Sequence, residues 1–169
     1  YIQARLGELS ASAVVINCQT GDLLAIASSP SYDPNKFVHR ISFADFSALR
    51  EDKRRPLASK TVQDAYPPGS VFKMLTALAA LDEGLITAAE TVRCNGHLEV
   101  SGRRFHCWKR AGHGKVDLEA SLRESCDVYF YELARKLGVD RLSVTAKKFG
   151  LGNKVLKDFG AEKSGVVPN

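Results

Sequence analysis

The chain has 169 residues, 44% of them hydrophobic and 25% charged, which is the composition of a globular protein and is long enough for one domain or two small lobes. It contains no apolar run of membrane-spanning length, no signal peptide and no internal repeat, so a membrane-spanning or repeat architecture is excluded for this stretch. The 24 Lys and Arg against 19 Asp and Glu leave a net charge of +5, a mildly basic balance that fits an anionic polymer as partner without requiring one.

Residues 11–28 are predicted to form a β-hairpin. The runs 12–17 and 23–28 are rich in β-prone apolar residues, and Cys18-Gln-Thr-Gly-Asp22 between them supplies the turn. Neither run alternates apolar and polar residues, so we expect a sheet that is covered on both faces.

Residues 29–69 are predicted to be a mostly irregular connection, because they are rich in Pro, Asp, Asn and Ser. Both ends of the chain look cut. Residues 1–10 begin inside a helical pattern without a cap, and residues 162–169 stop in a loop. We therefore expect a piece of a longer protein.

The remaining residues, 70–160, are predicted to form a helical lobe. The expected helices occupy residues 70–83, 117–124, 128–137 and 140–149, and three of them stop at a glycine. Strands followed by a block of helices indicate the α+β class.

The helix at 70–83 is apolar nearly all round, which predicts that it is buried. It follows Tyr66-Pro-Pro-Gly, so Ser70 lies at its N-terminus, where backbone N–H groups and the helix dipole stabilise developing negative charge. Lys73 follows one turn later on the same face, within reach of the serine hydroxyl, and a neutral amine there can take the serine's proton. The alternative is that Ser70 is an ordinary N-cap.

A second polar element, Ser125-Cys-Asp127, lies at the break between two expected helices, where side chains can leave the helical surface. Together with Tyr66-Pro-Pro-Gly-Ser-Val-Phe-Lys73, it resembles the penicillin-binding transpeptidases, and more closely their elongation-type class B members, penicillin-binding protein 2. Further segments that carry the resemblance are Thr20-Gly-Asp-Leu-Leu-Ala25, Tyr32-Asp-Pro-Asn35, Arg55-Pro-Leu57, Gly112-His-Gly114 and Glu162-Lys-Ser-Gly165.

The resemblance implies a serine acyl transferase that needs no catalytic cofactor. Ser70 would attack the D-Ala–D-Ala carbonyl of a peptidoglycan stem peptide, and a neighbouring amine would resolve the acyl-enzyme into a crosslink. β-Lactams would acylate the same serine. Lys73 would act as the base, Ser125 would relay protons, and Asp127 would hold Lys73 and the substrate.

The resemblance also implies a setting for the full-length protein. It would be anchored at the periplasmic face of the bacterial inner membrane, with membrane proteins of the elongation complex as partners. The basic residues around Trp108 are too few to indicate nucleic acid, and a solvated loop explains them better. No nucleic-acid partner is expected.

The family's third motif, Lys-Thr-Gly or Lys-Ser-Gly on a strand of the cleft, is expected much later in the chain. Lys163-Ser-Gly165 has those letters but lies too early and belongs to a different landmark of the subgroup. We therefore expect residues 1–169 to be the N-terminal part of a penicillin-binding/β-lactamase-like transpeptidase domain. The rest of the sheet and an N-terminal anchor and pedestal would be missing, and the activity of this piece would be weak or absent.

Three of the four cysteines, Cys94, Cys107 and Cys126, share the predicted helical lobe with His113. Cys3His is a common closed, structural zinc set, but the spacing is not a short zinc-finger pattern. A Cys94–Cys107 disulfide and unpaired buried thiols are the alternatives. The resemblance favours zinc, since some penicillin-binding protein 2 members carry a metal site in this lobe. A zinc bound by Cys126 would fix the loop that bears Ser125 and Asp127.

Two other functions share part of this pattern. A β-lactamase or β-lactam sensor on the same fold would also use Ser70 and Lys73, but the segments 112–114 and 162–165 argue against it. A non-catalytic, zinc-stabilised interaction module would use Ser70 only as a cap.

Overall fold

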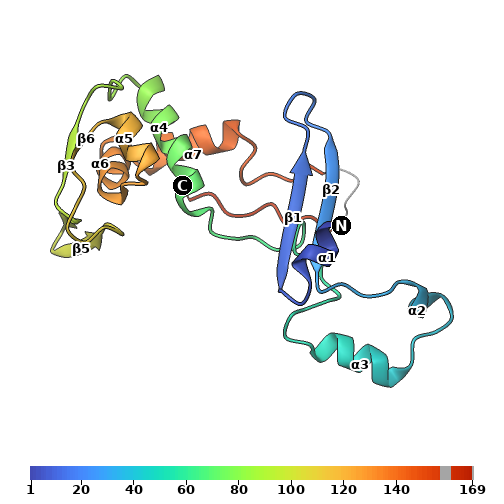
Figure 1. Cartoon of the computed structure of the whole chain (residues 1–169). Coiled ribbons are helices and arrows are strands. Elements are labelled where there is room, and N and C mark those ends of the chain that lie inside the picture. Colours follow the sequence, from blue (N-terminus) through green and yellow to red (C-terminus); the bar gives the residue numbers. More distant parts are fainter. Residues whose placement is uncertain (157–160, 169) are drawn as a thin grey trace. The chain divides into compact units, whose positions relative to one another are not determined.

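The computed structural model describes residues 1–156 and 161–168, which divide into two compact units. The first consists of Tyr1–Ala65 with Leu156–Lys163, and the second of Tyr66–Val155 with Ser164–Asn169. The mixture of strands and helices agrees with the predicted α+β class (Figure 1). Among the described residues, no helix has the length and apolar character needed to cross a membrane.

The first unit contains the predicted hairpin. Strands β1 (Ala11–Ile16) and β2 (Leu23–Ser29) pair antiparallel, with an irregularity between Val15 and Ile16. The turn is closed by Asn17, whose backbone N–H donates to the Asp22 carbonyl and whose side chain accepts from the Gln19 N–H.

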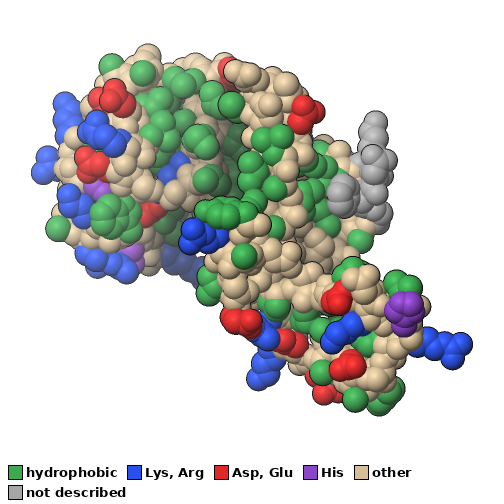
Figure 2. Space-filling view, turned by 45° about the vertical axis from the view of Figure 1, so that its right-hand side comes forward, with side chains coloured by type: hydrophobic (Ala, Val, Ile, Leu, Met, Phe, Trp, Pro, Cys, Tyr) green, Lys and Arg blue, Asp and Glu red, His purple; other side chains and the backbone are tan. Residues whose placement is uncertain are grey.

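The expectation that both faces of this hairpin are covered is wrong for the described residues. Val14 and Ile16 on one face and Val15 on the other are each at least 40% exposed. Among the described helices, the short helix α1 (Ile2–Leu6) packs against the two strands, and a loop segment that includes Ala58 and Lys60 bonds to Ser28 of β2. One turn and a half of helix and one loop do not cover two faces of a sheet. Exposed apolar side chains of this kind form the green areas of the surface in Figure 2.

Two helices interrupt the connection that we predicted to be mostly irregular: α2 (Asn35–Val38) and α3 (Phe43–Glu51). Helix α3 begins at a side-chain cap, since the Asp45 N–H donates to the Ser42 Oγ at 3.0 Å and the Ser42 hydroxyl donates to the Asp45 carboxylate at 2.8 Å. Ser-x-x-Asp ahead of a helix is a known start signal, and the sequence analysis overlooked it.

The second unit contains all four predicted helices, with ends shifted by one or two residues. A short 3-10 turn, η1 (Gly69–Val71), leads into α4 (Phe72–Asp82). The others are α5 (Leu118–Arg123), α6 (Asp127–Leu137) and α7 (Val139–Lys148), and Figure 1 shows them grouped around α4. The core of the unit is made of buried side chains from these helices and the loops around them: Ala77, Ala80, Ile86, Leu118, Val128, Tyr129, Phe130 and Leu133.

Helix α4 is not buried all round, contrary to prediction. Its small residues Ala77 and Ala80 are buried in the core together with side chains of α6, and the helix as a whole packs against α6 and α7. Its larger apolar residues Met74, Leu78 and Leu81 form an exposed stripe at helical spacing on the other side. The described residues supply neighbours for only one face of this helix.

The predicted helical lobe also contains four short strands that the sequence analysis missed. β3 (Val92–Cys94) pairs with β6 (Gly114–Val116), and β4 (His97–Val100) pairs with β5 (Arg103–His106), both antiparallel. Strands of three or four residues are too short to show a period in the sequence. The end of the predicted lobe, residues 157–160, lies outside the described residues.

Candidate active site

Ser70 lies in η1, immediately before α4, and is exposed. The N-cap positions of η1 and α4 are Pro68 and Val71, and neither terminus has a side-chain cap. The Ser70 hydroxyl is instead 2.8 Å from the Oγ of Ser125. The structure therefore does not support the interpretation of Ser70 as an ordinary helix cap.

Lys73 lies one turn further along, with a side chain that is only 13% exposed. Its Nζ donates to the carbonyl oxygen and to the Oγ of Ser125, both at 2.9 Å, and to Oδ1 of Asp127 at 2.6 Å. These three acceptors use all three donors of an ammonium group. We predicted that Lys73 would reach Ser70 directly, but the contacts between them run through Ser125.

Ser125 adopts the left-handed backbone conformation, with φ of 51°. Its N–H donates to the Leu122 carbonyl at the end of α5, and the next N–H, of Cys126, donates to the Ser121 carbonyl. A residue with a Cβ pays roughly 1 kcal/mol for this conformation. The turn joins α5 to α6, as predicted, and directs the Ser125 side chain towards Ser70 and Lys73.

Asp127 is the first residue of α6. Its Oδ1 accepts from Lys73, and its Oδ2 accepts from the backbone N–H of Trp108 at 2.9 Å. Burial raises the pKa of this carboxyl, but the hydrogen bonds from Lys73 and Trp108 outweigh burial and hold the pKa below its ordinary value. Asp127 is therefore an anion at neutral pH, and its Oδ1 holds the Lys73 side chain in place.

The four residues predicted to carry the chemistry thus meet in one network, from Ser70 through Ser125 to Lys73 and Asp127. An exposed hydroxyl linked to an enclosed amine through a second hydroxyl is an arrangement suited to nucleophilic catalysis.

The four predicted metal ligands also meet. The sulfur atoms of Cys94, Cys107 and Cys126 and a ring nitrogen of His113 all lie within 4.8 Å of one another. The Nδ1 of His113 is 3.6 Å from the Cys94 sulfur and 3.5 Å from the Cys107 sulfur. Ligands of a tetrahedral zinc stand roughly 3.4 to 3.8 Å apart, so this donor set fits that metal.

The environment of the cluster is closed. The three cysteines are at most 1% exposed, and the His113 side chain is fully enclosed, with its Nε2 lacking a hydrogen-bond partner. Burial raises the pKa of Cys94, but N–H groups of His113 and Gly96 outweigh burial and bring it to about 7, whereas burial raises that of Cys126 to about 12. All the cysteines are free thiols here, so the Cys94–Cys107 disulfide is not formed.

Trp108 joins the two clusters and is the residue that the sequence analysis missed. We assigned it to a solvated loop, and it is indeed 63% exposed. Its backbone N–H nevertheless donates to Asp127, its indole N–H donates to the Glu124 carbonyl at 3.0 Å, and its ring packs edge-on against His113. The signal available in the sequence was that the chain's only Trp directly follows a candidate metal ligand.

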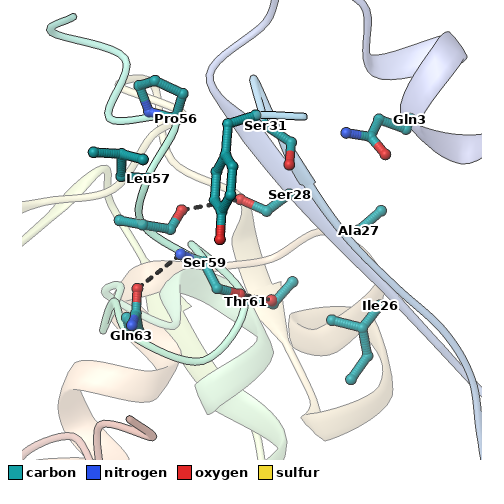
Figure 3. Close-up of a pocket in the computed structure, with 12 residues that line it drawn as sticks. Gln3, Ile26, Ala27, Ser28, Ser31, Pro56, Leu57, Ser59, Thr61 and Gln63 are labelled. Atoms are coloured by element: carbon teal, nitrogen blue, oxygen red, sulfur yellow. Dashed lines mark hydrogen bonds between the residues drawn. The ribbon is translucent and has the colours of Figure 1, made fainter. Parts of the chain in front are cut away.

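The first unit contains a cavity of about 370 Å³, but its lining lacks the groups needed for catalysis or metal binding. It is lined by hydroxyls and amides such as Ser28, Ser59 and Thr61, and Figure 3 shows the Ser59 N–H donating to Gln63 at 2.7 Å. Tyr32 is the only residue of its lining with an ionisable side chain, so it offers neither an acid–base pair nor metal ligands.

The sequence matches the family model of the penicillin binding protein transpeptidase domain over residues 11–169. It is 42% identical, over 99% of its length, to the peptidoglycan D,D-transpeptidase MrdA of Escherichia coli K12, of which it spans 27%.

Solved structures give the same result. Pseudomonas aeruginosa PBP2, in complex with WCK 5153, is 41% identical with a TM-score of 0.86, over 93% of this chain and 36% of that one. Helicobacter pylori PBP2, solved with MreC, is 36% identical with a TM-score of 0.89, over 94% of this chain and 30% of that one. The chain therefore spans between about a quarter and two fifths of the length of these relatives.

Proposed function

Because this chain belongs to the penicillin-binding protein transpeptidase family, we propose that it carries the nucleophile of a serine D,D-transpeptidase that crosslinks peptidoglycan stem peptides. The observation that carries the proposal is the position of the Ser125 Oγ, which contacts both the Ser70 Oγ at 2.8 Å and the Lys73 Nζ at 2.9 Å. One hydroxyl thus links the nucleophile to its base.

The proposed reaction uses these contacts. The step requires that Lys73 has first released one proton to solvent. The neutral amine then takes the Ser70 proton through the Ser125 hydroxyl while the Ser70 Oγ bonds to the carbonyl carbon of the penultimate D-Ala. The bond from that carbon to the nitrogen of the terminal D-Ala breaks, and the relay returns the proton to that nitrogen. The amine of a second stem peptide then bonds to the same carbonyl carbon, the bond from that carbon to the Ser70 Oγ breaks, and the relay moves the proton that the amine loses back to the Ser70 Oγ. Asp127 keeps Lys73 in place throughout.

We extend the proposal to the domain and its setting. Residues 1–169 would be part of one transpeptidase domain, in which 11–28 are the hairpin of the central sheet, 29–69 an irregular connection and 70–160 the helical lobe. The full-length protein would act at the periplasmic face of the inner membrane, within the elongation complex. The solved complex of the H. pylori relative with MreC supports a partner of that kind.

The test is the intact mass of the full-length protein with and without benzylpenicillin. We expect a gain of one drug molecule that Ser70→Ala abolishes and that the control Ser101→Ala, at an exposed turn, retains. The absence of an adduct on folded full-length protein would overturn the proposal, as would an adduct that survives in Ser70→Ala. An adduct that forms and then hydrolyses would identify a β-lactamase instead.

We also propose that Cys94, Cys107, His113 and Cys126 hold a structural zinc. The full enclosure of the four side chains and their mutual distances support it. When bound, zinc would supply a closed, redox-inert crosslink between the β3–β6 ribbon and the start of α6, and it would take no part in acyl transfer.

Elemental analysis of the full-length protein, purified under reducing conditions, tests this site. We expect about one zinc per chain. Cys94→Ala should lose it, and the control Cys18→Ser should retain it, because Cys18 is exposed and lies outside the cluster. Folded wild-type protein without zinc, whose buried thiols stay free, would overturn the proposal.

A further inference from the structure

Trp108 makes two hydrogen bonds to one short loop, which runs from the end of α5 to the start of α6. Its backbone N–H donates to the side chain of Asp127 at 2.9 Å, and its indole Nε1–H donates to the main-chain carbonyl of Glu124 at 3.0 Å. Ser125 lies between these two anchor points. Trp108 itself belongs to neither helix; it lies two residues after the end of β5 (His106), next to Cys107 in the chain.

The indole bond acts at the one place in this loop where the backbone is strained. The Glu124 carbonyl belongs to the peptide that Ser125 completes, and Ser125 is the residue with φ of 51°. Rotation of that peptide towards ordinary φ values would turn the Glu124 carbonyl away from its donor and move the Ser125 Oγ away from Ser70. A hydrogen bond that fixes the carbonyl therefore opposes relaxation of the strain.

The exposure of Trp108 also calls for an explanation. An indole that is 63% exposed contributes little to a core, and burial alone does not account for its position. What it does contribute is a rigid donor, because its ring edge packs against the enclosed His113 ring, with centroids 5.4 Å apart. The ring is thus supported from the side of the cysteine–histidine cluster while its N–H acts on the side of Ser125.

We propose that Trp108 is a positioning residue of the transpeptidase site, and that its indole N–H, through the Glu124 carbonyl, holds Ser125 in the conformation that places its Oγ between Ser70 and Lys73. The inference rests on the proposed function, since it assigns to Trp108 the geometry of the relay between nucleophile and base. Trp108 touches none of the reacting atoms and acts through the loop.

The experiment replaces the indole N–H and keeps the ring. In the full-length protein, Trp108 is changed to β-(3-benzothienyl)alanine, which has sulfur in place of the N–H, and in a second variant to Phe. Acylation by a fluorescent penicillin is followed in single turnover, and the rate constant, the amplitude and the non-covalent dissociation constant are determined separately. Phe149→Leu serves as the control, since Phe149 is a comparably exposed aromatic residue, 61%, outside the described site.

We expect the benzothienyl variant to acylate about tenfold more slowly, with unchanged amplitude and dissociation constant, because one hydrogen bond that positions Ser125 is lost. A merely structural role would lower the amplitude, which counts folded protein, and leave the rate constant of the rest unchanged. An unchanged rate constant in the benzothienyl variant, whatever the Phe variant does, or a slow phase shared by Phe149→Leu, would overturn the inference. If the wild-type protein is not acylated at all, the proposed function fails instead.

Discussion

The Oγ of Ser125 lies 2.9 Å from the Nζ of Lys73, although 52 positions separate the two residues in the chain. The same Nζ also reaches the Ser125 carbonyl and the Asp127 carboxylate, so one lysine ties the start of α4 to the start of α6. Through these contacts, Lys73 contributes both to the stability of this unit and to its proposed chemistry. Variants can separate its effect on stability from its effect on the acylation rate.

Lys73→Met should slow acylation by β-lactams about 100-fold to 10,000-fold, the range for loss of a general base. It should also destabilise the protein, because Asp127 is left partly buried with the Trp108 N–H but without its cation. Adding Asp127→Asn to Lys73→Met should restore part of the stability and none of the rate. Urea unfolding and single-turnover acylation measure the two effects, and a double variant less stable than Lys73→Met would contradict this account.

A comparison of Ser125→Gly with Ser125→Ala should separate the backbone strain at Ser125 from the contribution of its hydroxyl to acylation. Both remove the hydroxyl of the relay, so both should acylate at least about 100-fold more slowly. Glycine adopts φ of 51° without the cost of a Cβ, so Ser125→Gly should be about 1 kcal/mol more stable than Ser125→Ala. Equal melting temperatures of the two variants would show that the left-handed conformation is not strained.

Gly96→Ala should be far more damaging than Gly102→Ala, although both glycines have positive φ. A Cβ at Gly96 would stand 2.0 Å from the Arg110 carbonyl oxygen, whereas a Cβ at Gly102 would meet open space. We expect about 1 kcal/mol of lost stability at Gly102 and about 3 kcal/mol or more at Gly96. Chemical unfolding measures both. Similar losses would mean that the loop can move away from Arg110.

Lys60→Met should stabilise the protein at neutral pH. Lys60 is 4% exposed, and burial, followed by the charge of Arg55, lowers the pKa of its amine. The pKa of Lys60 is lower in the folded state than in the unfolded state, so below the folded pKa the charged lysine destabilises the protein. This destabilisation decreases as the pH rises from the folded pKa to the unfolded pKa. The Lys60 amine donates to the Arg55 carbonyl, and this bond is lost in Lys60→Met. The carbonyl still accepts a hydrogen bond from the Ala58 N–H, so the change leaves it with a partner.

The advantage of Lys60→Met over wild type should therefore be present near pH 7 and shrink towards the ordinary lysine pKa, near pH 10.4. Unfolding free energies of both proteins across this range test the prediction. A difference that grows with pH would have the wrong sign for a desolvated lysine.

Local signals in the sequence were sufficient for the hairpin at 11–28 and for the four helices of the second unit. Each depends on contacts between near neighbours, such as a turn at Asn17 or a glycine at the end of α6. Ser70 and Lys73 could likewise be paired from their spacing, because residues three apart share a helix face. The start of helix α3 could also have been predicted, from Ser42 and Asp45 at capping-box spacing, but we did not predict it.

The exposure of β1 and α4 and the presence of the short strands β3–β6 could not be predicted from local sequence signals. The apolar runs of β1 and α4 show which residues can be buried, but exposure depends on which neighbours are present. Pairing of β3 with β6 joins residues from different parts of the chain, and three-residue strands leave no period to detect.

What the sequence by itself predicted is the set of proposed reactive residues, Ser70, Lys73, Ser125 and Asp127, and the proposed Cys94, Cys107, His113 and Cys126 donor set. The spacing of Ser70 and Lys73 on one helix carries the first pair, and the resemblance to the penicillin-binding transpeptidases carries the rest. What only the tertiary structure decided is how they are connected: Ser70 reaches Lys73 through Ser125, and an exposed Trp108 holds the loop between them. These hydrogen bonds join residues that are far apart in the chain. Their distances and angles are set by the packing of α4 against α6, so they could not be predicted from local sequence patterns.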